Sequence, residues 1–215
     1  MAIKQFNLAD GQRAERKTLI TVAEWIEYTA LATQPSDWAT KYTDYYTKSG
    51  NVYTKIPTAS EAPTFVANQY YEGTSQREIL GTRTPDSSID YNNDIETSTD
   101  IRGFNYTDLN KTQPQQDFDP YLVLGGSKLG AFLNDIRRRN AISELNQFTI
   151  YVITAFIGDE TNGYEAERHV GCTITYNSIG GDSNVNFPIS VYLSNNSVTG
   201  VVDVLNPNFE FTADV

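Results

Sequence analysis

The chain has 215 residues, of which 39% are hydrophobic and 20% are charged, so it is too apolar for a disordered protein and far too polar for a membrane protein. Its single cysteine, Cys172, and single histidine, His169, exclude an internal disulfide, a thiolate metal cluster and most nucleophile–base pairs. The formal net charge of −11 predicts that double-stranded DNA is repelled and not bound.

Residues 1–32 predict an N-terminal arm followed by a first strand. Residues 1–16 are polar and lack the basic and apolar regions of a signal peptide, and no apolar run in the chain approaches the ~20 residues that span a bilayer. We therefore expect assembly in a cytoplasm. Residues 17–28 (KTLITVAEWIEY) are rich in β-branched and aromatic residues and predict a strand, although the spacing of Val22, Trp25 and Ile26 also allows a helix in the second half.

Residues 33–74 predict a tyrosine-rich module inserted between two strands. The segment holds a near-repeat, because residues 37–46 (DWATKYTDYY) and 63–71 (PTFVANQYY) both place a Tyr-Tyr pair after an aromatic anchor. The segment is too short to bury a full core, so we expect its aromatic rings to stack on one another and on a neighbour. A sugar-binding aromatic surface is the functional alternative. The residues of this surface are Trp38, Tyr42, Tyr45, Tyr46, Tyr53, Phe65, Tyr70 and Tyr71.

Residues 75–119 predict strands joined by polar loops. Residues 77–83 form a predicted strand that Pro85 closes, residues 86–119 alternate weakly and predict two or three strands in long hairpins, and residues 113–116 predict a turn. Acidic residues gather between 86 and 119, where Arg102 and Lys111 are the basic residues. Such a stretch is ordinarily a solvated surface, and a wall facing a channel is the alternative.

A helix is predicted over residues 128–139. Leu129, Phe132, Leu133 and Ile136 form one apolar stripe at helical spacing, which predicts that this face packs on the core. Ser127 is suited to cap the start of the helix. The run Arg137-Arg138-Arg139 suits the negative end of the helix dipole, and an electrostatic docking patch is an equal alternative.

The remaining residues predict a series of strands. Residues 147–157 (QFTIYVITAFI) are almost continuously apolar and predict a strand buried on both faces or at an interface. Residues 169–178 alternate, which predicts that Val170, Cys172, Ile174 and Tyr176 share one face. Further strands are expected over 186–194, 199–205 and 209–212. The chain is therefore expected to be mainly β, with one helix.

Motifs for catalysis, cofactors or metals are weak throughout. Residues 125–128 (GGSK) lack the spacing of a phosphate loop. Residues 90–96 are rich in oxygen ligands but lack the central glycine and final glutamate of a calcium-binding EF-hand loop. Asp117 and Asp119 would share a strand face, yet a carboxylate hydrolase needs acids from distant segments. We expect no enzyme, no cofactor and no metal.

An ordered series of short segments resembles the major tail tube protein family of siphophages, the bacteriophages with long, non-contractile tails. The matching segments, in order, are 17–28, 81–97 (GTRTPDSSIDYNNDIET), 99–103 (TDIRG), 117–121 (DFDPY), the helix and strand within 129–157, and 176–200, which includes YNSIGGD and FPISVY. Residues 33–74 lie outside the common core, and residues 194–196 (SNN) replace the family's small-residue and glycine turn.

The resemblance implies a tail-tube-type β-sandwich or barrel with one flanking helix, over 75–215 and the first strand. It also implies that six copies form a ring, that rings stack into a tube in the virion tail, and that double-stranded DNA passes through without specific binding. Tape measure and tail terminator proteins are the implied partners. The arm and residues 110–120 are candidates for contacts between rings. An acidic lumen is expected, with Asp90, Asp94, Glu96 and Asp100 as candidates. A receptor- or carbohydrate-binding module of a tail tip is the alternative function.

Overall fold

The computed structural model describes residues 7–9, 12–15, 18–50, 52–81, 88–99, 101–102, 104–122, 124–180 and 185–214. The fold is mainly β and antiparallel, with 46% of residues in strands and 14% in helices. The strands are β1 Leu19–Ala30, β2 Tyr46–Ser49, β3 Val52–Lys55, β4 Tyr70–Ile79, β5 Ile89–Asp90, β6 Asp94–Thr99, β7 Asn105–Lys111, β8 Gln115–Phe118, β9 Phe148–Asp159, β10 Gly163–Tyr176, β11 Ile189–Tyr192, β12 Ser197–Val202 and β13 Phe211–Ala213.

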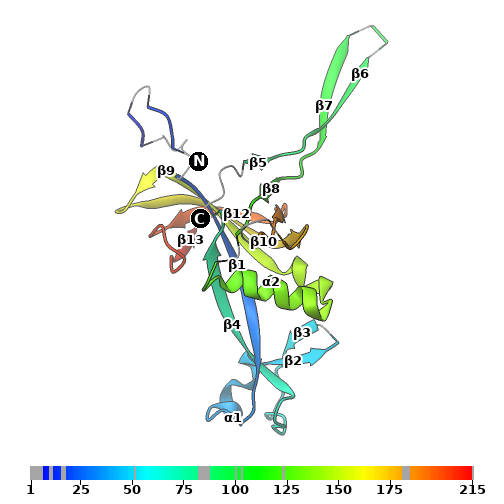
Figure 1. The fold of residues 1–215 in the computed structure, drawn as a ribbon, viewed down its shortest axis with the longest axis vertical. Helices are drawn as coiled ribbons and strands as arrows, with labels where there is room; N and C mark the ends of the chain where they lie inside the picture. Colours follow the sequence, from blue (N-terminus) through cyan, green and yellow to red (C-terminus); the bar gives the residue numbers. More distant parts are fainter. Residues whose placement is uncertain are drawn as a thin grey trace.

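Most strands belong to one long sheet with the order β3-β2-β4-β1-β9-β10-β11-β8-β5, and β12 and β13 branch from β10 (Figure 1). The strand predicted over 77–83 is wrong in its start, because β4 begins at Tyr70 and pairs there with the end of β1. The turn predicted at 113–116 is wrong in its second half, which begins strand β8. Strands β6 and β7 form a separate two-stranded sheet.

Strand β10 changes its pairing partner on one side at Gly171. Residues 164–169 pair with β12 on the side away from β9, whereas residues 173–176 pair with β11. The register with β9 shifts between Val170 and Cys172, and Gly171 has φ +77°, a conformation that L side chains rarely adopt. The extra residue reverses the alternation of the strand. The predicted placement of Val170 on the buried face is therefore wrong: its side chain is 40% exposed, whereas Cys172 and Ile174 are buried.

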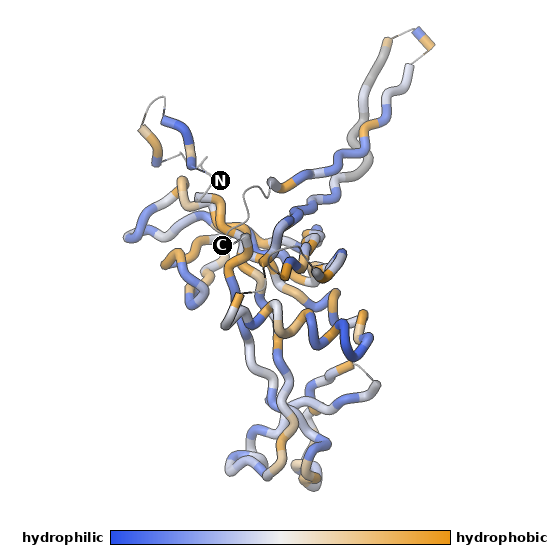
Figure 2. Tube along the Cα trace, in the orientation of Figure 1, coloured by the Kyte–Doolittle hydropathy of each residue, from blue (hydrophilic) through white to orange (hydrophobic). Residues whose placement is uncertain are grey.

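The hydrophobic core lies on both sides of β9. Phe148 and Ile150 belong to the larger cluster, which the second half of β10, β8, β11 and the helix α2 complete. Tyr151 and Ile153 belong to a smaller cluster on the opposite face, under β12 and Phe209. This confirms the prediction of a strand buried on both faces. Figure 2 shows the apolar segments gathered in this central body.

Helix α2 spans Lys128–Arg139, the range expected from the sequence, and a four-residue helix α1 at Trp38–Lys41 was not expected. The Ser127 hydroxyl accepts a hydrogen bond from the Gly130 amide and so caps α2. Leu129, Leu133 and Ile136 are fully buried, and Phe132 packs beside them. Two 3₁₀ turns, Tyr42–Asp44 and Ile142–Asn146, follow the two helices.

A carboxylate from the sheet completes the cap of helix α2. Glu78 on β4 accepts hydrogen bonds from the backbone amides of Lys128 (2.8 Å) and Leu129 (3.1 Å). Its other oxygen accepts from the hydroxyls of Ser127 (2.8 Å) and Tyr121 (2.9 Å). A negative charge at this end also favours the helix dipole. Glu78 therefore fixes the helix to the sheet.

A second network joins strands β1, β4 and β9 on the face of the smaller core cluster. The Glu24 carboxylate accepts hydrogen bonds from Ser75 (2.6 Å) and Tyr151 (2.7 Å) and lies 3.2 Å from the Arg77 guanidinium. Burial alone would raise the pKa of Glu24, but these partners outweigh it and hold the pKa below its ordinary value. Burial and the bond to Glu24 raise the pKa of Tyr151 to about 12.

Replacing Glu78 is expected to destabilise the protein. The substitution Glu78→Ala leaves two helix amides without their acceptor, so the free energy of unfolding should fall by roughly 2–3 kcal/mol in urea titrations. The exposed Glu72 on the same strand provides the control, since Glu72→Ala should change stability by less than about 0.5 kcal/mol. Equal losses in the two variants would contradict the capping role.

The Glu24 network predicts a specific loss of stability in acid. Because the folded-state pKa of Glu24 is lowered, its contribution is present above the unfolded-state pKa of about 4.3 and is lost as pH falls through the folded value. Glu24→Gln should cost roughly 1–3 kcal/mol at neutral pH and less at about pH 3. Urea unfolding at several pH values measures the difference, with the exposed Glu61→Gln as control. Parallel pH profiles for the Glu24 variant and the native chain would contradict the linkage.

Candidate assembly surfaces and a charged pocket

The β6–β7 hairpin projects away from the rest of the molecule (Figure 1). Its backbone register runs from Asp94 opposite Lys111 to Thr99 opposite Asn105. Ile95 on β6 is 58% exposed, and Phe104 just before β7 is 69% exposed. An isolated two-stranded hairpin is at best marginally stable in water, so a projecting hairpin with exposed apolar side chains is suited to contact another molecule.

The four acidic lumen candidates do not form one group. Asp90 lies on β5, and its carboxylate accepts a hydrogen bond from the Asn92 amide, which shapes the turn before β6. Asp94 and Glu96 are exposed on the projecting hairpin, where Glu96 is in register with Asp108. Asp100 lies outside the described residues. The sequence segment is continuous, but the turn at 91–93 separates its acids into two places.

One sheet face is polar, and its residues come from segments that are separate in the sequence. It is the face of β5, β8, β11 and the second half of β10 that is turned away from the larger core cluster. Register places Asp90 beside Gln115 and Asp117 beside Ser190. In the described strands this face carries two carboxylates and no basic side chain; its members there are Asp90, Gln115, Asp117, Thr173, Thr175, Ser190 and Tyr192. Gln115 and Asp117 are two residues apart, which would place them on the same face of a strand. The turn predicted at 113–116 hid this pattern.

The N-terminal arm contacts the far end of strand β9. The Asn7 amide donates to the Phe156 carbonyl at 2.9 Å, and the Asn7 side chain donates to the Gly158 carbonyl. Strand β1 pairs with β9 only as far as Thr154, and Asn7 contacts that edge of β9 beyond the last β1 pair. The 110–120 candidate segment consists of the end of β7, a short link and strand β8.

The aromatic residues of the insertion form two groups. Trp38 and Tyr42 are buried with Ile56 in a small core of their own, which Tyr45, Phe65 and Tyr70 cover. The insertion thus buries more than we expected from its length. The two tyrosine pairs of the near-repeat lie side by side, because Tyr46 on β2 pairs with Tyr71 on β4.

The second group packs on the main sheet, as the stacking prediction required. Tyr53 stacks on Tyr28 of β1 with ring centroids 3.8 Å apart, and it meets Tyr71 edge to face. Tyr28 also meets Tyr46 edge to face. Tyr28 and Tyr53 therefore each cover one face of the other, and the aromatic surface is less open than a sugar platform requires.

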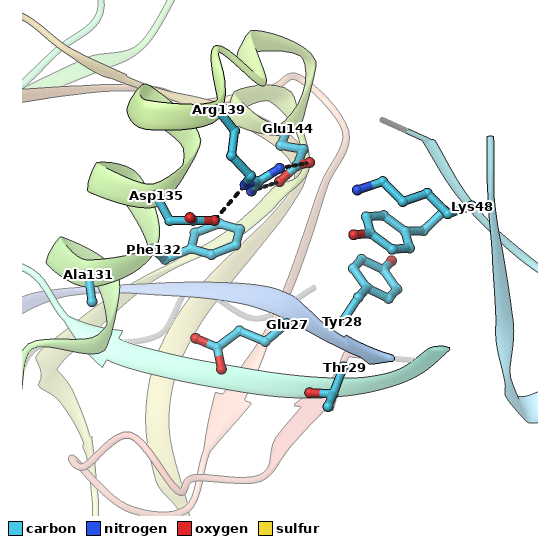
Figure 3. Close-up of a pocket in the computed structure, with 10 residues that line it drawn as sticks. Glu27, Tyr28, Thr29, Lys48, Ala131, Phe132, Asp135, Arg139 and Glu144 are labelled. Atoms are coloured by element: carbon cyan, nitrogen blue, oxygen red, sulfur yellow. Dashed lines mark hydrogen bonds and ion pairs between the residues drawn. The ribbon is translucent and has the colours of Figure 1, made fainter. Parts of the chain in front are cut away.

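A charged pocket lies between helix α2 and the β2–β3 hairpin and has a volume of about 470 Å³ (Figure 3). Figure 3 shows Asp135, Arg139 and Glu144 on the helix side and Lys48 and Tyr28 on the opposite side. The lining residues come from five elements and their links: Glu27, Tyr28, Thr29, Lys48, Tyr53, Ala131, Phe132, Asp135, Arg139 and Glu144. Tyr53, Phe132 and Arg139 of this set are named from the sequence, each for a different reason, and nothing local in the sequence groups them.

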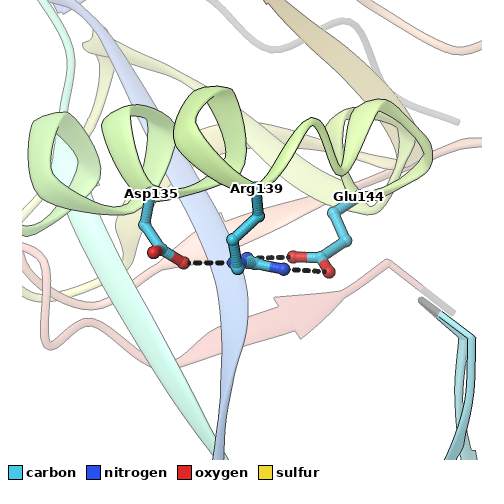
Figure 4. A network of polar contacts seen from close by, with 3 residues as sticks. All are labelled: Asp135, Arg139 and Glu144. Carbon is cyan, nitrogen blue, oxygen red and sulfur yellow. Dashed lines mark hydrogen bonds and ion pairs between the residues drawn. The ribbon is translucent and has the colours of Figure 1, made fainter.

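The arginine run at the end of α2 is used within the chain. The Arg139 guanidinium donates to both oxygens of Glu144 at 2.9 Å and to Asp135 at 2.6 Å (Figure 4). These hydrogen bonds raise the pKa of Arg139 further above its usual value, so the charge is permanent. Arg137 donates to Asn134. Arg139 and Arg137 thus serve local contacts at the helix C-terminus.

Comparison with protein-family models, curated proteins and solved structures finds no match to this chain. Within the described ranges, no three His, Cys, Asp or Glu side chains are grouped so that they could hold a metal ion. In the same ranges, no helix has the length and apolar character needed to cross a membrane. Function must therefore be argued from the surfaces themselves.

Proposed function

We propose that the chain is a structural subunit of a long, non-contractile bacteriophage tail tube. Six copies would form a ring, and stacked rings would enclose an acidic channel for double-stranded DNA. The ordered resemblance of residues 17–28 and 76–215 to siphophage tail tube proteins suggests this function, and the mainly β antiparallel fold agrees with it. The proposed role is structural, without a catalytic centre, a cofactor or a metal.

The projecting hairpin carries the proposal. A monomer gains little from extending β6 and β7 into solvent with Ile95 and Phe104 exposed. A repeating assembly gives the hairpin a surface on the next copy and buries those side chains. We assign the hairpin to contacts between subunits, whereas Asn7 of the arm is bonded to β9 of its own chain.

Open sheet edges support closure into a ring. In the described part of the chain the long sheet ends at β3 and β5, and the branch ends at β13. An edge strand has unpaired backbone groups that a neighbouring copy can pair with. Joining such sheets around an axis would produce the proposed barrel and would remove the edges.

The polar face of β5, β8, β11 and β10 is the best candidate for the channel wall. Asp90 and Asp117 repel phosphate, and the face has no lysine or arginine to bind it. Each phosphate contact by a basic side chain would add salt-dependent attraction and slow the passage of DNA. We therefore retain Asp90 as a lumen candidate, add Asp117, and place Asp94 and Glu96 on the intersubunit hairpin.

The alternative is a receptor- or carbohydrate-binding module of a tail tip. The mutual stacking of the insertion's aromatic rings argues against a broad aromatic sugar platform. The charged pocket is the one feature that favours ligand binding, and it can coexist with a structural role. Tube formation therefore tests the main proposal independently of sugar binding.

Purified protein is expected to form tubes or six-fold rings in negative-stain electron microscopy. Ile95→Glu combined with Phe104→Glu should abolish tubes, because charged side chains resist burial at the contact, while thermal unfolding stays within about 2 °C of the native chain. Ile142→Glu is the matched control, since Ile142 is equally exposed but lies on a 3₁₀ turn. A native chain that remains monomeric at high concentration would overturn the proposal.

Cysteine labelling can identify the channel wall. Cys172 is buried, so a cysteine placed at Asp117 is the reactive thiol. A maleimide carrying a large polyethylene glycol should label Asp117→Cys roughly tenfold more slowly in tubes than in separate subunits, because the wall is confined. Arg138→Cys on the exposed side of α2 should label equally in both states. Unchanged labelling of Asp117→Cys on assembly would place this face outside the channel.

A further inference from the structure

A buried hydrogen-bond donor without a partner lies near the charged pocket. A small cavity of about 50 Å³ adjoins the pocket and shares Tyr28, Phe132 and Glu144 with it. Trp25 also lines this cavity. Its side chain is 2% exposed, and its indole N–H has no hydrogen-bond partner in the described part of the chain. An indole N–H can only donate, so a group that enters here must offer an acceptor oxygen or nitrogen.

The charges around the pocket nearly cancel. Glu27, Asp135 and Glu144 are acidic, and Lys48 and Arg139 are basic. Arg139 is already bound to two of these acids. A strongly anionic ligand would be repelled by the three carboxylates. A strongly cationic ligand would be repelled by Lys48. The lining thus selects against both and favours a neutral ligand with many donors and acceptors.

Several polar groups of the lining retain hydrogen-bonding capacity. The carboxylate oxygens of Glu144 each accept one bond from Arg139 and can each accept another. Lys48 lies over the Tyr53 ring with its ammonium 4.7 Å from the centroid, which leaves its N–H groups able to donate. The stacked pair of Tyr28 and Tyr53 forms a rigid wall beside these groups. Donors and acceptors therefore converge in a space of defined shape.

We propose that this pocket binds a neutral saccharide of one or two rings. Its volume of about 470 Å³ falls in the range of small-ligand sites, and saccharide hydroxyls can donate to the carboxylates while accepting from Lys48 and the Trp25 indole. Aromatic side chains next to polar groups provide both contact area and orientation. The inference does not depend on the tube proposal, and either can fail alone.

The test uses the full chain and a matched series of probes. N-acetylglucosamine, glucose and galactose are the neutral probes, glucosamine is the cationic one and glucose 6-phosphate the anionic one. Saturation-transfer NMR should give signals for at least one neutral sugar, with a dissociation constant of about 1 mM or below and weaker signals for the charged probes. Ala131→Phe fills the mouth of the pocket from the exposed side of α2 and should weaken binding at least about tenfold.

Controls separate the site from the fold. Arg138→Phe, on the same helix but away from the lining, should bind like the native chain and unfold at the same temperature as Ala131→Phe. Trp25→Phe, which removes the indole donor, should also weaken binding. Absence of any neutral-sugar signal, a stronger signal from either charged probe, or equal binding by Ala131→Phe would overturn the proposal.

Discussion

Strand β10 pairs with different strands along its two halves, and the rest of the structure depends on this arrangement. Its first half holds β12 and the smaller core cluster, and its second half holds β11, β8 and the larger cluster. The positive φ at Gly171 and the bulge beside it let one continuous strand change its partner. In the second half of β10 the buried side chains face helix α2. The opposite side of that half is the polar face that we assign to the channel.

The sequence predicted elements that are set by local pattern. Helix α2 was found because its apolar stripe and Ser127 cap lie within a few residues of one another. Strand β9 was found because burial on both faces leaves an almost continuous apolar run. Val170 was misplaced because alternation assumes an uninterrupted strand, and a single glycine bulge reverses it. No periodicity signal marks the residue at which such a reversal occurs.

The candidate surfaces were less predictable because they depend on long-range register. Asp90 and Asp117 reach one face through β8, which bridges β5 and β11, whereas Asp94 is only four residues from Asp90 and lies on another sheet. The pocket brings together Glu27 and Arg139, which are far apart in sequence. Nothing local in the sequence shows which charged side chains will face one another.

The two ends of the insertion lie side by side where β1 ends and β4 begins. Its flanks are joined by the bonds from the Leu31 amide to the Tyr70 carbonyl and from the Asn68 amide to the Leu31 carbonyl, each 2.8 Å. Strands β1 and β4 pair from Ala30 opposite Tyr71 onward. The segment has its own small core around Trp38. When the two ends of a segment lie this close together, the segment between them can usually be replaced by another one. The segment between these ends can therefore be exchanged without disturbing the pairing of β1 with β4.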